Sequence, residues 1–187
     1  PTLPAGARFE RRHHACTHGA RDLRLYVPAS VATGGAAGLV VMLHGCTQTP
    51  EDFATGTAMN AQGERHRLIV AYPGQGRGDN AQGCWNWFRP QDQGRGGEAG
   101  LIADLARDLA TEFDIPPGRV FVAGLSAGGA MAAIAAEAHA DVFAAAGVHS
   151  GLAPGAARDV GSAFAAMQGG SGGAVPRAPT ILFHGSA

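Results

Sequence analysis

The sequence predicts an α/β fold, in which a mostly parallel central sheet carries helices on both faces. Short apolar runs alternate with longer stretches of helical periodicity, which is typical of βαβ units. The central apolar runs are also continuous, as in strands that are buried on both faces. The 187 residues, 45% of them apolar, are enough for one domain with one core.

Six apolar runs predict the strands. The first, Leu23–Val27, alternates and stops at Pro28, so we expect an early antiparallel strand at the edge of the sheet. The other runs are bounded by turn residues and follow in chain order: Leu39–Leu43, Leu68–Tyr72, Val120–Ala123, Phe143–Val148 and Thr180–Phe183.

The intervals between these runs predict four helices. They cover approximately Pro50–His66, Gly100–Phe113, Ser126–Ala138 and Asp159–Met167. A break at Gly56 is expected in the first, and three leucines share one face of the second. Glycine-rich stretches at Gly74–Gly83 and Gly169–Gly173 predict loops.

Charge and cysteine usage exclude several classes of protein. With a net charge of −1, the protein has no long-range electrostatic attraction to nucleic acid, so a nucleic-acid-binding protein is not expected. No apolar run approaches the roughly 20 residues that are needed to cross a bilayer. The spacing of the three cysteines fits no zinc site. Cys16 lies in a histidine-rich stretch, His13–His18, that invites a metal-site interpretation. We prefer a polar lead-in to the first strand and expect no metal.

The segment Gly124–Gly129 lies between an apolar strand and an apolar helix. A G-x-S-x-G pattern in this setting predicts a nucleophile elbow, with Ser126 as the nucleophile. Gly124 and Gly128 would let strand and helix approach closely. An ordinary tight turn is the alternative.

Acyl transfer also needs amide donors for the oxyanion. The N–H of Ala127, the residue after the nucleophile, predicts one donor. The turn after the strand Leu39–Leu43 predicts the other, because Gly45 lets the backbone turn and the amide of Cys46 can then face the site. We interpret the His44 ring as a packing residue and not as a base.

Four ordered motifs point to a family: His44–Gln48, Cys84–Phe88, Gly124–Met131 and Phe183–Gly185. They resemble the polyhydroxybutyrate-depolymerase family of esterases, which is related to feruloyl and acetylxylan esterases. The resemblance implies an α/β-hydrolase fold, no cofactor, and hydrolysis of carboxylic esters through a Ser-Asp-His triad with an acyl-enzyme at Ser126. The substrate would be a short-chain polyhydroxyalkanoate polyester or its oligomers. The alternatives are a feruloyl or acetylxylan esterase, and a non-catalytic ligand-binding domain on the same fold.

The resemblance also suggests a Cys46–Cys84 disulfide that leaves Cys16 free, with two reduced cysteines as the alternative. A disulfide favours an oxidising compartment, so we expect a secreted or periplasmic protein, the cytoplasm being the alternative. Trp85 and Trp87 are expected to line an apolar groove for an acyl chain, with a place in the core as the other interpretation.

His149 ends a predicted strand and is expected at the same rim, where it could contact substrate. In this family the acid follows the His184-Gly185 motif and the histidine comes later still. We therefore expect residues 1–187 to be a single catalytic domain that is incomplete at its C-terminus, with the triad Asp and His beyond Ala187. Asp159 with His184 is the alternative pair within the chain.

Overall fold

The computed structural model describes residues 3–168, 173 and 177–185, and within them seven strands form one sheet. Its order is β1-β2-β4-β3-β5-β6-β7, and the strands from β4 to β7 run parallel. β1 and β2 form an antiparallel hairpin, which joins β4 in antiparallel register. The strands are Arg8–Cys16, Gly19–Val27, Gly38–Leu43, Leu68–Pro73, Val120–Leu125, Ala145–His149 and Thr180–Phe183. The predicted mostly parallel sheet is confirmed.

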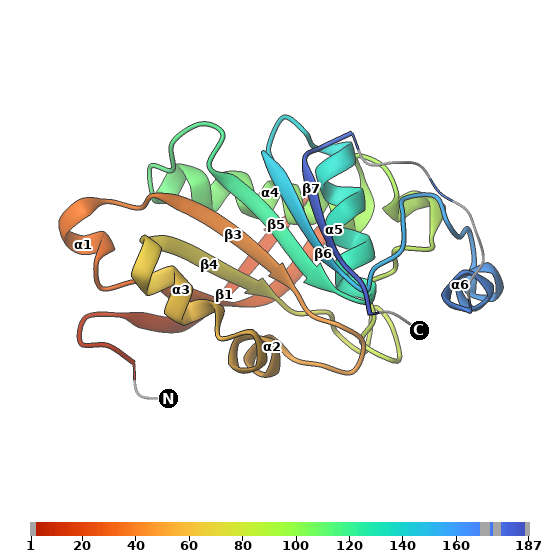
Figure 1. Ribbon diagram of the computed structural model, residues 1–187, viewed down its shortest axis with the longest axis horizontal. Coiled ribbons are helices and arrows are strands. Elements are labelled where there is room, and N and C mark those ends of the chain that lie inside the picture. Colours follow the sequence, from red (N-terminus) through yellow and green to blue (C-terminus); the bar gives the residue numbers. More distant parts are fainter. Residues whose placement is uncertain (1–2, 169–172, 174–176, 186–187) are drawn as a thin grey trace.

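Helices cover both faces of the sheet, as predicted (Figure 1). In chain order they are α1 (Val31–Gly34), α2 (Pro50–Thr57), α3 (Met59–His66), the 3₁₀ turn η1 (Pro90–Asp92), α4 (Gly97–Glu112), α5 (Ala127–Ala138) and α6 (Val160–Met167). No described helix is long and apolar enough to cross a membrane.

The core has two parts because strand side chains alternate between the two faces. On β3, Leu39, Val41 and Leu43 belong to the larger cluster, which includes side chains of α4 and α5. Val40 and Met42 belong to the second cluster, which includes side chains of α2. All six residues of β3 are buried, so the prediction of a central strand is confirmed.

The N-terminal hairpin differs from the prediction. Residues 8–16, which include the stretch expected as a polar lead-in, form β1, and β1 pairs with β2 over its whole length. Leu23–Val27 is therefore not at the edge of the sheet, because β2 has a partner on each side. The prediction of a polar lead-in was wrong because the stretch is rich in charged and histidine residues and was therefore not recognised as a strand. An edge strand with one solvated face tolerates charged residues on that face, and on the other face Arg12 and His14 pair with carboxylates of α4.

The helical stretch that follows β3 is interrupted at a different residue from the one expected. Gly56 lies inside α2, and Ala58 separates α2 from α3 in the left-handed conformation, with φ 51°. A helix can end on any residue that reaches this conformation, although glycine reaches it at the lowest cost. Residues 169–172 of the predicted loop Gly169–Gly173 lie outside the described residues.

Candidate active site

Ser126 lies in the sharp turn between β5 and α5. Its backbone has φ 56° and ψ −119°, a conformation that residues with a side chain rarely adopt. The Ser126 N–H donates to the carbonyl of His149 at 2.9 Å, which ties the turn to the end of β6. The structure thus has the strand–turn–helix geometry of a nucleophile elbow at this serine.

Two glycines allow the elbow to pack without a collision. A Cβ on Gly124 would collide with the main-chain carbonyl group of Gly128. A Cβ on Gly128 would collide with the main-chain carbonyls of Leu43 and His44. The first turn of α5 therefore lies directly against the C-terminal end of β3.

The turn after β3 has its own local hydrogen bonds. The Gly45 N–H donates to Oε1 of Gln48 at 2.8 Å, and Thr47 adopts a left-handed backbone with φ 65°. The Cys46 N–H donates no backbone hydrogen bond to a described residue. Ala127 is the first residue of α5, where the N–H has no partner within the helix. Two free amide donors thus lie on neighbouring segments, one of them at the helix N-terminus that favours negative charge.

His44 is held by hydrogen bonds at both ring nitrogens and is 1% exposed. Nε2 accepts the main-chain N–H of Gln75 at 3.0 Å, which places the ring proton on Nδ1, the atom that donates to the Gly45 carbonyl at 2.7 Å. Burial lowers the pKa of His44, so the ring stays neutral. The interpretation of His44 as a packing residue is confirmed.

A disulfide between Cys46 and Cys84 joins the turn after β3 to the long loop between β4 and α4. The Thr47 N–H also donates to the carbonyl of Gln82 in that loop, at 2.9 Å. Cys16 is a free cysteine. The loop that contains the tryptophan pair is thus attached to the turn that carries the Cys46 amide.

The prediction that Trp85 and Trp87 line a groove is wrong. Trp85 has no exposed surface and Trp87 is 5% exposed, and both belong to the larger core cluster. The cause lies between them: the Asn86 N–H donates to the buried carboxylate of Glu98 at 2.7 Å, which draws the loop inward. The two indoles are consequently part of the core.

Glu98, in the first turn of α4, was not predicted as a site residue. Glu98 is 6% exposed, and its carboxylate also accepts hydrogen bonds from the side chains of Asn86, Gln75 and Arg21. Burial raises the pKa of Glu98, although these hydrogen bonds oppose the rise. The sequence gives no signal that an acidic residue at the start of a helix will be a buried hydrogen-bond acceptor, because the side chains that donate to it come from other segments.

His149 is exposed at the end of β6, and its ring stacks on Phe183 with 6.3 Å between ring centroids. Both residues border an apolar pocket of about 380 Å³ on the α2 face of the sheet, which Leu125 also lines. The pocket therefore adjoins the residue before Ser126. Contact between His149 and a substrate remains a prediction.

The alternative pair of Asp159 and His184 is not brought together. The Asp159 carboxylate accepts the N–H of Ser162 at 2.7 Å and caps α6. His184 Nε2 lies 3.3 Å from the carbonyl oxygen of Gly151. Among the described residues, no hydrogen bond joins the Ser126 hydroxyl to a histidine.

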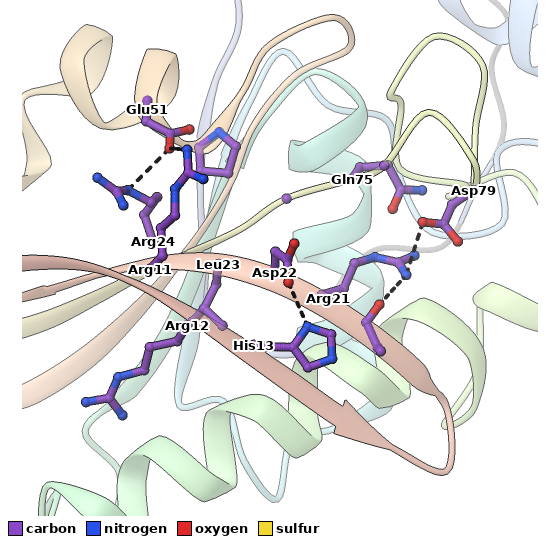
Figure 2. Close-up of a pocket in the computed structure, with 14 residues that line it drawn as sticks. Arg11, Arg12, His13, Arg21, Asp22, Leu23, Arg24, Glu51, Gln75 and Asp79 are labelled. Carbon is purple, nitrogen blue, oxygen red and sulfur yellow. Dashed lines mark hydrogen bonds and ion pairs between the residues drawn. The ribbon is translucent and has the colours of Figure 1, made fainter.

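A larger pocket, of about 740 Å³, lies on the β1–β2 hairpin near the N-terminus of α2 (Figure 2). Its arginines face carboxylates: Arg24 lies 3.3 Å from Glu51, and Arg21 lies 3.3 Å from Asp79. The pocket holds no strained serine and no free amide pair. It is therefore not the candidate active site.

The chain matches the model of a known protein family over most of its length. The model described as "Esterase PHB depolymerase" matches residues 22–180. Poly(3-hydroxyalkanoate) depolymerase C of Paucimonas lemoignei is 40% identical over 146 residues, which are 78% of this chain and 34% of that protein. Feruloyl esterase B of Neurospora crassa is 32% identical over 130 residues, 68% of this chain and 43% of that protein. The chain thus spans less than half the length of these relatives.

The fold is also found in solved structures. The acetyl xylan esterase from Aspergillus awamori superposes with a TM-score of 0.69 at 24% sequence identity, over 82% of this chain and 56% of that one. This likeness shows the fold alone, and it confirms the α/β-hydrolase fold that the resemblance implied.

Proposed function

The chain belongs to the esterase PHB depolymerase family, and we propose that it is the nucleophile-bearing part of a serine esterase. The observation that carries this proposal is the backbone of Ser126, strained at φ 56° in a turn that abuts the end of β3. A module that only binds a ligand has no use for a strained serine, which speaks against the non-catalytic alternative.

In the proposed mechanism the Ser126 oxygen attacks the ester carbonyl, and its proton passes to a histidine. The N–H groups of Cys46 and Ala127 donate to the developing oxyanion, a contribution of roughly a hundred- to a thousandfold in rate for each donor. The alcohol leaves, and water then releases the acid from the acyl-enzyme. No cofactor takes part in these steps.

The triad acid and histidine are proposed to lie outside residues 1–187. Two observations support this: Asp159 and His184 are engaged elsewhere, and the chain covers only 34% of its depolymerase relative. Without a base, Ser126 stays protonated and weakly nucleophilic, and loss of the base in a comparable serine hydrolase costs about a millionfold in turnover.

The proposed substrate is a short-chain polyhydroxyalkanoate polyester or its oligomers, because the depolymerase relative has the higher identity. A feruloyl or acetylxylan ester is the second candidate, favoured by the feruloyl esterase among the relatives. We also propose a secreted or periplasmic location, since the Cys46–Cys84 disulfide is of the kind that persists in oxidising compartments.

The test is intact-mass spectrometry before and after a fluorophosphonate probe, on the 187-residue chain and on a chain extended at its C-terminus. We expect one phosphonyl adduct on the extended protein, none on its Ser126→Ala variant, and almost none on the shorter chain. An adduct that survives Ser126→Ala would refute the nucleophile, and rapid labelling of the 187-residue chain would refute an external base. Hydrolysis of polyhydroxybutyrate against feruloyl and acetyl esters then separates the two substrate classes.

A further inference from the structure

Helix α4 faces β1 with a row of carboxylates. On β1, Arg12, His14 and Cys16 occupy alternate positions, so their side chains share the face that packs on α4. On α4 three acidic residues are four positions apart and form one stripe: Asp104, Asp108 and Glu112.

The carboxylates in this row differ in their partners. Glu112 is neutralised by Arg12, with 2.6 Å between Nη1 and Oε2. Asp104 and Asp108 have only His14 as a basic partner among the described residues, at 2.9 Å from Nε2 and 3.5 Å from Nδ1. Two carboxylates therefore share one imidazole, and among the described residues no arginine pairs with either of them.

Cys16 completes the cluster. It is a free, partly buried cysteine, and the main-chain N–H of His18 donates to its Sγ at 3.4 Å. The ligand atoms of His14, Cys16 and Asp104 all lie within 4.8 Å of one another. His14 is 8% exposed, so its ring is fixed by packing.

We propose that His14, Cys16 and Asp104 bind a divalent transition-metal ion of the Zn²⁺ type. A histidine nitrogen, a thiolate and a carboxylate oxygen are the ligands that zinc prefers, and water would take the fourth position of a tetrahedron. The site reverses the expectation of no metal, because the sequence spacing did not reveal that α4 contributes a ligand. It is independent of the proposed esterase function.

Asp108 has a separate role in this site. With the metal on Nε2, Nδ1 of His14 faces the Asp108 carboxylate at 3.5 Å, and attraction to this carboxylate favours the ligating orientation of the ring. Asp108 is thus a positioning residue. The ligands come from a strand and a helix that already pack together, so metal binding needs no rearrangement of the backbone.

The test is equilibrium dialysis of the untagged protein, with Cys16 kept reduced, against Zn²⁺ alone, followed by elemental analysis. We expect one Zn²⁺ per chain, at least a tenfold loss of affinity in Cys16→Ser and in His14→Gln, and a loss of about tenfold in Asp108→Asn. His13→Gln is the matched control. His13 is the neighbouring histidine on the exposed face of β1, and it also contacts an aspartate, Asp22, at 2.6 Å (Figure 2). The His13→Gln variant is expected to bind Zn²⁺ with the affinity of the wild type.

Cobalt provides a second measurement that does not depend on the stability of a variant. Co²⁺ bound to the wild type should give a thiolate-to-metal charge-transfer band in the near ultraviolet, and Cys16→Ser should lack it. Absence of stoichiometric Zn²⁺ uptake, absence of that band, or an equal loss of affinity in His13→Gln would each overturn the proposal. Mg²⁺, which prefers oxygen ligands, should not compete.

Discussion

The main-chain N–H of Gln75 donates to Nε2 of His44 at 3.0 Å, and this contact joins the end of β4 to the turn that carries the Cys46 amide. The other ring nitrogen donates to the carbonyl of Gly45. His44 thus braces the turn as a neutral ring, and it has no free nitrogen with which to accept a proton from a nucleophile.

His44→Gln is therefore expected to lower the rate of the active esterase without changing its pH dependence. Loss of two buried hydrogen bonds should cost about 2 kcal/mol of stability and loosen the oxyanion turn. The measurements are the pH–rate profile and urea unfolding, with His66→Gln at the end of α3 as the control. A shift of the acidic limb of the profile in His44→Gln would mean that this histidine titrates during catalysis.

Gly128→Ala should destabilise the protein by about 3 kcal/mol or more, because the added methyl group meets two main-chain carbonyls that cannot move independently. The matched control is Gly56→Ala in α2, where no atom lies within 4 Å of the new Cβ. That substitution should stabilise the protein by about 0.5–1 kcal/mol. Urea unfolding measures both, and a Gly128→Ala protein as stable as the wild type would contradict the close approach of α5 to β3.

Removal of the Cys46–Cys84 disulfide, by replacing both cysteines with serine, should cost about 4 kcal/mol or less, since the bond closes a loop with a sequence separation of 38 residues. Activity should fall as well, because the turn at Cys46 then loses its attachment to the loop. Cys16→Ser, studied without metal, is the control and should unfold at the same denaturant concentration as the wild type. Equal stability of the double variant would show that hydrogen bonds such as that from Thr47 to Gln82 suffice to hold the loop.

The central sheet and the elbow could be predicted because their signals are local. The continuous apolar run of β3 and the glycines around Ser126 each report on a few neighbouring residues. The inward turn of Trp85 could not be predicted in this way. It depends on Glu98, which lies on another element, and an aromatic residue in a glycine-rich loop is compatible with either position.

The N-terminal hairpin was missed for a related reason. Half of β1 faces solvent, so its sequence lacks the apolar alternation by which a strand is recognised. The partners of its inward side chains are the carboxylates of α4, about ninety residues later in the chain. Only the folded structure brings His14 next to Asp104.

Asp141 makes part of the stability depend on pH. Its carboxylate accepts hydrogen bonds from Arg95 at 2.9 and 3.1 Å and from Arg107 at 2.9 Å, and these arginines, Arg95 first, hold the pKa of Asp141 below its usual range. A lowered pKa adds stability above the pKa of the unfolded chain, and this contribution is lost as the pH falls towards the pKa of the folded state.

Asp141→Asn should accordingly reduce stability at pH 7 and have a smaller effect at pH 2, where the contribution is partly lost. Because the side chain is 51% exposed, the difference should be only about 0.5–1 kcal/mol. Urea unfolding at both pH values measures it, with the exposed Asp114→Asn as the control. A loss that is equal at both pH values would mean that the ion pairs contribute nothing and that the substitution acts through packing.

The strain at Ser126 predicts that Ser126→Gly is more stable than the wild type, whereas Ser126→Ala is not. Glycine adopts φ 56° with ψ −119° without a steric penalty, and relief of about 1–3 kcal/mol of strain outweighs the roughly 0.5–1 kcal/mol that its greater unfolded-state entropy costs. Alanine keeps a Cβ and therefore keeps the strain. The Ser126 hydroxyl makes no capping hydrogen bond to α5, so neither variant loses one. Urea unfolding of the three proteins decides the matter: a Ser126→Gly variant about 1 kcal/mol above Ser126→Ala is expected, and equal values would mean that the backbone at Ser126 is relaxed.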